Sequence, residues 1–118
     1  MDRALDQAIE QIADLIVQAK TVVVFTGAGI STESGISDFR SPGGIWTKYN
    51  PEDFTYQKFL SSEETRRLTW KRFREIPWLK VQPNAAHLAV AELERLGKLD
   101  CVITQNVDGL HQKAGNTE

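Results

Sequence analysis

The sequence predicts an α/β fold built on a doubly wound parallel sheet, and three observations predict it. An uninterrupted apolar run at Val22–Phe25 indicates a strand covered on both faces, and the short run Cys101–Thr104 ("CVIT") indicates a second buried strand. A helical pattern precedes each run. A glycine-rich stretch follows the first strand directly. The order helix, strand, glycine-rich turn, helices, strand is the order in which such a sheet begins.

The first element is an amphipathic helix over residues 4–19. Its apolar positions recur at the spacing of one helix face, and they are Leu5, Ala8, Ile9, Ile12, Leu15, Ile16 and Ala19. The opposite face is polar and carries Asp6, Gln7, Glu10 and Asp14. The strand at Val22–Phe25 follows this helix.

The segment between the two strands is predicted to be mainly helical. The stretch "SSEETRRLTWKRFRE" predicts a helix that begins at Ser61 or Ser62, with Glu64 available for a capping box. Its basic residues alternate with acidic ones, which favours a solvated helix face. The cluster is Arg66, Arg67, Lys71, Arg72 and Arg74. A further helix begins at the N-cap Asn84 and ends at Gly97.

Composition excludes several classes of partner. The 118 residues are 41% apolar and 25% charged, with a formal net charge of −2. We therefore expect neither nucleic-acid nor membrane binding and a cytoplasmic location. Cys101 is the single cysteine, so the sequence forms no internal disulfide and no multi-cysteine metal site.

Two polar segments follow the strands, "GAG" from Gly27 and "QNVDGLHQKAG" from Gln105. Parallel pairing would bring both to one edge of the sheet, where ligands of this fold class bind. The glycines and the amides of a following helix near Ile30–Glu33 suit a diphosphate. The G-x-G-x-x-G spacing is not met, because Thr32 occupies the third glycine position. Taken alone, the glycines could serve only the turn.

Three stretches, "GAGISTESGISDFRSPGGIW", "PNAAHLAVAELE" and "TQNVDGLHQKAG", resemble the sirtuin family of NAD-dependent protein lysine deacylases. The resemblance runs from the first helix to the last residue. It implies a partial Rossmann-like sheet in which residues 1–118 are the amino-terminal part of an NAD-binding catalytic domain. A helical insertion would span about residues 47–82. The family's zinc module and the carboxyl-terminal half are absent from this sequence, so structural zinc is expected only in the full-length family fold.

The resemblance also implies roles for individual residues. Gly27, Ala28, Gly29 and Thr32 would lie at the NAD diphosphate. Asp38, Phe39 and Arg40 would belong to the mobile cofactor loop. Gln105 and Asn106 would bind the nicotinamide ribose and an ordered water, so that Asn106 supports catalysis, while Val107 and Asp108 would hold the nicotinamide carboxamide. Structurally, Asp38 could instead be a turn residue, Arg40 a surface charge and His87 a core histidine that needs one hydrogen-bond partner.

The implied activity is transfer of an acyl group, with acetyl preferred, from a lysine of a protein or peptide to ADP-ribose, with release of nicotinamide. The family's general base is a histidine in a His-Gly motif that would follow Glu118, and His111 does not replace it. We therefore expect the chain alone to be inactive. Two alternatives stay open: a catalytically silent NAD or ADP-ribose binder, and an ADP-ribosyltransferase of the same fold. The unfinished sheet edge could also support self-association or pairing with another chain.

Overall fold

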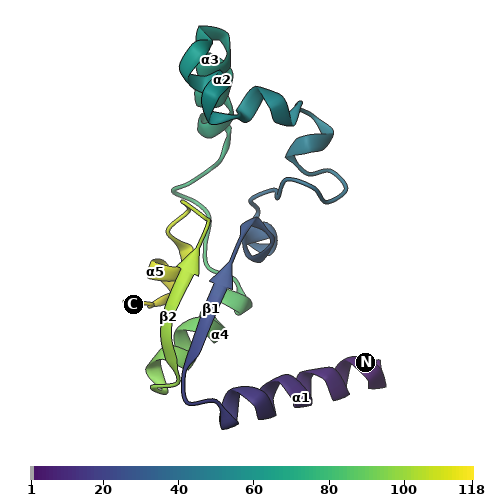
Figure 1. Cartoon of the computed structure of the whole chain (residues 1–118), viewed down its shortest axis with the longest axis vertical. Coiled ribbons are helices and arrows are strands. Elements are labelled where there is room, and N and C mark those ends of the chain that lie inside the picture. Colours follow the sequence, from purple (N-terminus) through teal and green to yellow (C-terminus); the bar gives the residue numbers. More distant parts are fainter. Residues whose placement is uncertain (1) are drawn as a thin grey trace.

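The computed structural model describes residues 2–118, and Met1 lies outside the described residues. The predicted order of helices and strands is confirmed (Figure 1). In chain order the α-helices and strands are α1 (Arg3–Gln18), β1 (Val22–Thr26), α2 (Tyr56–Ser61), α3 (Glu63–Glu75), α4 (Ala85–Arg95), β2 (Leu99–Thr104) and α5 (Leu110–Ala114). Three 3-10 helices lie between β1 and α2: η1 (Ala28–Ser34), η2 (Ile45–Thr47) and η3 (Pro51–Phe54).

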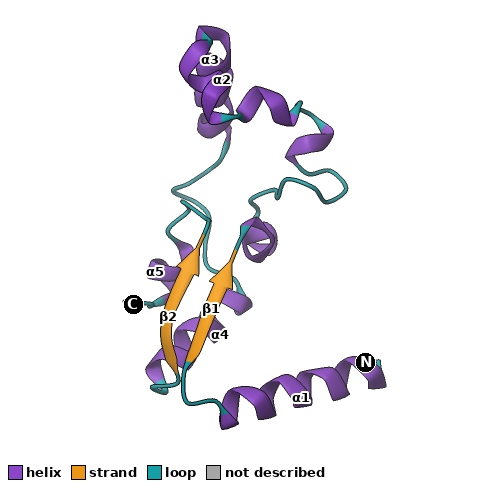
Figure 2. Cartoon of the chain, in the orientation of Figure 1, coloured by secondary structure: helices purple, strands orange, loops and turns teal. Residues whose placement is uncertain are grey.

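Strands β1 and β2 pair in parallel, so their carboxyl ends point the same way (Figure 2). Val24 lies opposite Val102 and Thr26 opposite Thr104. The pairing continues one residue beyond the strands, because the Gln105 amide donates to the Thr26 carbonyl at 3.0 Å. The sheet therefore brings the two polar segments to one rim, as the sequence predicted.

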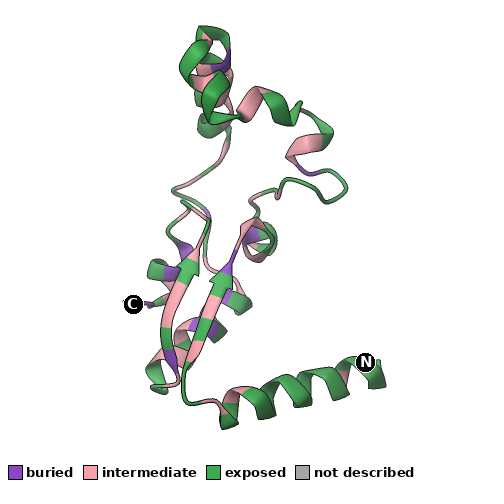
Figure 3. Cartoon of the chain, viewed as in Figure 1, coloured by how far each residue is buried: buried purple, intermediate pink, exposed green. Residues whose placement is uncertain are grey.

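The prediction that β1 is covered on both faces is wrong for the described residues. Burial alternates along the strand, and Val23 and Phe25 are 47% and 63% exposed, as is about half of Ile103 on β2. Helices α4 and α5 pack together beneath one face of the sheet, while α1 extends away from the sheet (Figure 3). An apolar run indicates only that both faces suit burial, and within residues 2–118 helices cover one of them.

Helix α1 confirms the helix predicted over residues 4–19. Its N-cap is Asp2, whose side chain accepts a hydrogen bond from the Ala4 amide, and none of the helix residues is buried. Its carboxyl end is held by the Lys98 ammonium, which donates to the carbonyls of Val17 and Ala19 at 2.8 and 2.6 Å. A cation at this end satisfies carbonyls that the helix leaves unpaired.

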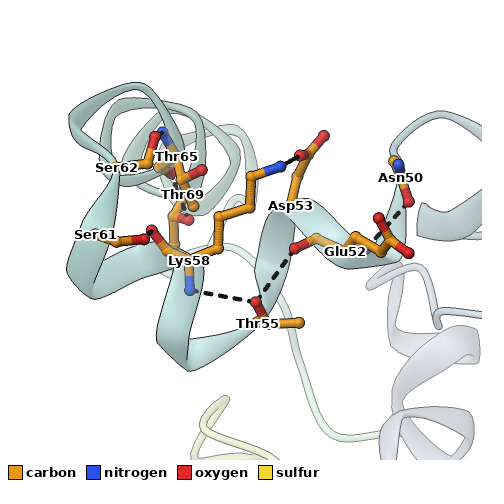
Figure 4. Close-up of polar contacts among 9 residues, drawn as sticks. All are labelled: Asn50, Glu52, Asp53, Thr55, Lys58, Ser61, Ser62, Thr65 and Thr69. Atoms are coloured by element: carbon orange, nitrogen blue, oxygen red, sulfur yellow. Dashed lines mark hydrogen bonds and ion pairs between the residues drawn. The ribbon is translucent and has the colours of Figure 1, made fainter.

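The segment between η1 and α4 forms a helical lobe at the upper end of Figure 1. Short polar side chains begin its helices (Figure 4): Asn50 accepts from the Glu52 amide, Thr55 from the Lys58 amide and Ser62 from the Thr65 amide. Ser62 is thus the N-cap of α3. The predicted capping box with Glu64 does not form, because Glu64 occupies the second helical position and Thr65 the third.

Helix α4 begins and ends where the sequence predicted. Asn84 is its N-cap, and Gly97 follows the C-cap Leu96 with a φ of +73°, a left-handed conformation that glycine adopts without strain. At its far end Glu94 accepts hydrogen bonds from the amides of Thr117 and Glu118. The last residues of the chain therefore run along β2, where the Glu118 carbonyl accepts from the Val102 amide at 3.2 Å.

The best-buried residues beneath the sheet include two histidines. His87 on α4 is fully buried and His111 on α5 is 3% exposed, and their rings meet edge to face with centroids 5.1 Å apart. Burial, followed by the neighbouring His111, lowers the pKa of His87, which Asp108 opposes. Burial likewise lowers the pKa of His111, again against Asp108. Both rings are therefore neutral in the folded chain at neutral pH.

This histidine pair should make folding stability depend on pH in a defined window. Because both folded pKa values lie below the ordinary 6.5, the unfolded chain takes up protons first as the pH falls. The free energy of unfolding should be highest above pH 6.5, the ordinary pKa of histidine. It should decrease as the pH falls from there through the folded pKa values. A folded histidine pKa that is lower by one pH unit reduces the free energy of unfolding in acid by about 1.4 kcal/mol. Urea denaturation at about pH 7.5, about pH 6.5 and about pH 5.5 measures this slope above the carboxylate range.

Variants identify the groups responsible. Replacing both His87 and His111 by Asn should lower stability but flatten its pH dependence in this window. A wild-type stability that stays constant or rises on acidification to about pH 5.5 would contradict the assignment.

Candidate functional site

The candidate site lies at the carboxyl ends of the two strands. Gly27–Gly29 follow β1 and Gln105–Asp108 follow β2, and the parallel register places both segments at the same rim. The sequence motifs that lie far apart along the chain therefore form one composite site.

Three direct hydrogen bonds join the two segments. The Ser31 hydroxyl, which is 1% exposed, donates to Asp108 Oδ2 at 2.6 Å. Asn106 Nδ2 donates to the Gly27 carbonyl at 2.9 Å and lies 3.4 Å from Ser31 Oγ. The 3-10 helix η1 thus fixes the side chains of both Asn106 and Asp108.

The turn after β2 is further held by its own backbone. The Asn106 amide donates to Thr104 Oγ1 at 3.1 Å, and Asp108 Oδ1 accepts from the Leu110 amide at 3.0 Å at the start of α5. Gly109 has a φ of +69°, which allows the chain to reverse between Asp108 and α5. One oxygen of Asp108 therefore contacts η1 and the other contacts α5, so its carboxylate has a fixed orientation.

The glycines after β1 are not required by the chain's own packing. Gly27 has a φ of −135°, and a Cβ built there would meet the Gln105 side chain only at 4.0 Å, an ordinary contact. A Cβ on Gly29 would have no atom within 4 Å and would face open space. Neither backbone strain nor crowding within residues 2–118 explains why these two positions are glycine. The close approach of an external group to the backbone would explain it.

The helix expected near Ile30–Glu33 is a 3-10 helix that starts earlier, at Ala28. It ends at Gly35, which has a φ of +96° and returns its amide to the carbonyls of Ser31 and Thr32. The glycine therefore closes the turn, one of the structural roles that the sequence alone left open for these glycines.

A cleft of about 240 Å³ opens between the rim and the helical lobe. Of the predicted site residues, those that line it are Ala28, Phe39, Gln105, Asn106, Val107 and Asp108. The facing wall is mostly apolar and includes Ile45, Phe54, Phe73, Ile76 and Trp78. The cleft thus combines an apolar wall with the fixed amide and carboxylate of Asn106 and Asp108.

Pairs of tilted aromatic rings support the facing wall. Phe39 packs on Trp46 with ring centroids 5.1 Å apart, and Trp46 packs on Phe54 at 5.6 Å. Phe73 and Trp78 form a second pair at 4.8 Å. Such pairs contribute about 0.5–1.5 kcal/mol beyond the area that they bury, which holds residues from separate segments in one wall.

Three of the remaining predicted residues lie beside this cleft. Gly29, Thr32 and Asp38 line an adjoining hollow together with Gly43 and Gly44. The Thr32 hydroxyl donates to the Gly29 carbonyl at 3.0 Å within its own turn. Arg40 is exposed and lines neither space.

Asp38 shapes the loop in which it lies. Its carboxylate accepts hydrogen bonds from the Ser41 amide at 3.2 Å and from the Ser41 hydroxyl, and its carbonyl accepts from the Ile45 amide at 2.8 Å. A Cβ at the buried Gly44 would come within 2.8 Å of Asp38 Oδ1, so this close turn requires glycine. Asp38 is therefore a turn residue that also helps to position the loop carrying Phe39.

Arg72 departs from the predicted solvated face of α3. Thr69, Arg72, Phe73 and Ile76 all line the cleft, at the spacing of one helix face. Arg72 is half-buried, and its Nε has no hydrogen-bond partner among residues 2–118. The alternation of basic and acidic residues along a helix does not show which basic side chain faces the interior in the folded protein. The other four members of the basic cluster line a shallow surface hollow with Trp70: Arg66, Arg67, Lys71 and Arg74.

Sequence reasoning missed Ser31 as a site residue and underestimated His87. His87 is a buried histidine, as expected, but both ring nitrogens have polar neighbours: the Asn84 amide at 3.2 Å and Ser31 Oγ at 3.4 Å. Ser31 contacts residues 56 and 77 positions away. No local spacing signals contacts of this separation. The one available sign was a small hydroxyl residue inside the glycine-rich motif.

Two other kinds of feature are absent from residues 2–118. Among residues 2–118, no three His, Cys, Asp or Glu side chains are grouped so that they could hold a metal ion. In the same part of the chain, no helix has the length and hydropathy needed to cross a bilayer.

Known proteins resemble both the sequence and the fold. A model of the Sir2 family matches residues 27–118. The chain is 50% identical to NAD-dependent protein deacetylase 1 of Bradyrhizobium diazoefficiens and 49% identical to the NAD-dependent protein deacetylase of Thermodesulfovibrio yellowstonii, covering 94% and 98% of this chain. It spans only 44% and 45% of those two proteins.

A solved Sir2 structure with a p53 peptide and NAD⁺ has a TM-score of 0.74 and is 40% identical, over 93% of this chain and 43% of that one. The shared architecture is the partial Rossmann-like α/β fold that the sequence predicted. With most of its length matched by the family model, and with this fold, the chain belongs to the Sir2 family, known also as the sirtuins.

Proposed function

We propose that the chain forms the nicotinamide-binding part of the NAD cleft of an NAD-dependent protein lysine deacetylase, which transfers the acetyl group to ADP-ribose and releases nicotinamide. The observation that carries the proposal is the convergence of the first and third sirtuin-like stretches, which begin at Gly27 and Thr104, on one cleft, with Ser31 and Asp108 joined at 2.6 Å. Because the chain spans less than half of its curated relatives, the activity is proposed for the whole protein to which this segment contributes.

The residues present fit NAD. The open space at Gly29 would admit a diphosphate against the backbone, with Thr32 in the same hollow. Asp108 would accept a hydrogen bond from the nicotinamide carboxamide, since its carboxylate is held in place at both oxygens. Gln105, Asn106 and Val107 line the same cleft and would contact the nicotinamide and its ribose.

The loop residues would control access to the site. Phe39 is 40% exposed and packs against Trp46 at the cleft, so its ring is available to keep water away from the nicotinamide ribose. Arg40 is exposed and follows Phe39 directly, which leaves its guanidinium available to a phosphate.

The chemistry makes use of a dry, oriented cleft. NAD would supply a ribose carbon from which nicotinamide departs as positive charge develops on the sugar. The apolar wall would exclude water, while the fixed Asn106 and Asp108 would hold the departing nicotinamide ring in one orientation. The acyl-lysine carbonyl of a protein or peptide substrate would approach the same carbon. One solved relative contains a p53 peptide together with NAD⁺, which supports a substrate of this class.

Gly29→Ala tests the diphosphate contact without disturbing the fold. The new methyl group meets no atom of the chain and Gly29 has no positive φ, so thermal stability should stay within about 1 kcal/mol of wild type. The methyl group should nevertheless block the backbone, and NAD affinity measured by calorimetry should fall by about tenfold or more. Gly97→Ala is the opposite control, because its φ of +73° makes the substitution destabilising at a position outside the cleft. Unchanged NAD affinity in Gly29→Ala would contradict the proposed diphosphate position.

Product analysis tests the reaction itself. The native protein that carries this chain should convert NAD and an acetyl-lysine peptide, with one water, into nicotinamide, O-acetyl-ADP-ribose and the deacetylated peptide in equal amounts. Asn106→Ala removes the amide that contacts the Gly27 carbonyl and should lower nicotinamide release by about tenfold or more. Asn50→Ala, which alters an N-cap in the helical lobe, is the matched control and should retain activity.

The two alternatives give different products. ADP-ribosylation of the peptide with the acetyl group still on lysine would identify an ADP-ribosyltransferase. Binding of NAD or ADP-ribose with no release of nicotinamide would identify a silent binder.

A further inference from the structure

The amino end of α4 makes hydrogen bonds in two directions. Asn84 Oδ1 caps its own helix by accepting from the Ala86 amide at 2.9 Å. Its Nδ2 donates to the Ile30 carbonyl at 2.6 Å and to Ser34 Oγ at 3.1 Å, both on η1. A single side chain thus ties α4 to the 3-10 helix that carries Ser31.

His87 extends this tie to the cleft. Its Nδ1 accepts a hydrogen bond from the backbone N–H of Asn84 at 3.2 Å. A ring nitrogen that accepts a hydrogen bond carries no proton of its own. The ring proton of neutral His87 is therefore on Nε2, which faces Ser31 Oγ at 3.4 Å. Ser31 in turn donates to Asp108 Oδ2. The donors run in one direction from the Asn84 amide through His87 and Ser31 to Asp108.

We propose that Asn84 and His87 are positioning residues that hold Ser31 and Asp108 at the cleft, and that they do so only while His87 is neutral with its proton on Nε2. The ligand of the cleft rests on the proposed function, whereas the arrangement of the four side chains stands on the hydrogen bonds alone.

Protonation of His87 would disrupt this arrangement at a definite point. A proton on Nδ1 would face the Asn84 amide, and two donors would then oppose each other at the start of α4. The titratable groups that face the ring are His111 on α5 and Asp108 on the loop after β2. Burial and His111 disfavour the charged ring and Asp108 favours it, and the balance lowers the pKa of His87. Acidification should therefore loosen η1, and with it the cleft.

The tautomer can be measured without any ligand. Nitrogen-15 NMR of histidine-labelled chain should show His87 with a protonated Nε2 and an unprotonated Nδ1 at neutral pH. The same tautomer should persist at pH 6.5, where an ordinary histidine is half-charged. A proton on Nδ1 at neutral pH, or titration of His87 at or above pH 6.5, would overturn the proposal.

Asn84→Ser separates the tie from the helix cap. Serine keeps a capping oxygen for α4 but has no Nδ2 group to donate to Ile30 and Ser34. Hydrogen exchange of the η1 amides should accelerate by about tenfold while that of the α4 amides is retained, and NAD affinity should fall by about tenfold, the equivalent of one hydrogen bond. Asn50→Ser makes the same substitution at the N-cap of η3 and should leave both quantities unchanged. Equal effects of the two variants, or none from Asn84→Ser, would refute a positioning role.

His87→Asn tests the dependence on charge. Its amide oxygen can accept from the Asn84 amide near the position of Nδ1, but it does not titrate. Exchange of the η1 amides in wild type, corrected for the intrinsic effect of pH, should accelerate as the pH falls below 6.5, and His87→Asn should lose this part of the acceleration. An unchanged profile in the variant would overturn the proposal. If the native protein that carries this chain fails to bind NAD, the proposed ligand is wrong, and the tautomer and exchange measurements still decide the role of Asn84 and His87.

Discussion

The buried hydroxyl of Ser31 is the contact on which the site depends. It lies within hydrogen-bond distance of Asp108, Asn106 and His87, which come from the loop after β2 and from α4. Because Ser31 is 1% exposed, water cannot replace a lost partner, and an unsatisfied buried polar group costs about 1–3 kcal/mol. The network is therefore stable only when all of these segments are in place together. Its geometry determines how the polar side of the cleft is presented.

Local signals in the sequence predicted the elements well, and for physical reasons. Asn84 and Gly97 mark the two ends of α4, and the sequence predicts both because capping and left-handed backbone geometry depend on neighbouring residues alone. The common rim of Gly27 and Gln105 was also predictable, since parallel strands end at the same edge. Assigning the family required the long motifs in addition, because the glycine spacing by itself departs from the dinucleotide fingerprint at Thr32.

What the sequence did not predict depends on contacts between distant residues. The inward orientation of Arg72 follows from the way in which α3 meets the cleft, and its charged neighbours carry no sign of it. The hydrogen-bond partners of Ser31 at His87 and Asp108, and those of Asn84 on η1, lie 50 or more positions away in the chain. Phe25 on β1 shows the opposite case. Its residue type suits burial, but within residues 2–118 no helix or strand covers the face of the sheet on which it lies.

The parallel register has a consequence for the order in which the molecule assembles. Thr26 and Thr104, whose hydroxyls meet at 2.8 Å at the ends of β1 and β2, are 78 positions apart, and the whole helical lobe lies between them. Closing such a long loop costs chain entropy before any contact repays it, so this pairing is intrinsically slow compared with formation of the local helices. The rim, and every hydrogen bond across it, can form only after that step. During folding, the capped helices can therefore arise early, whereas the cleft is among the last features of the chain to appear.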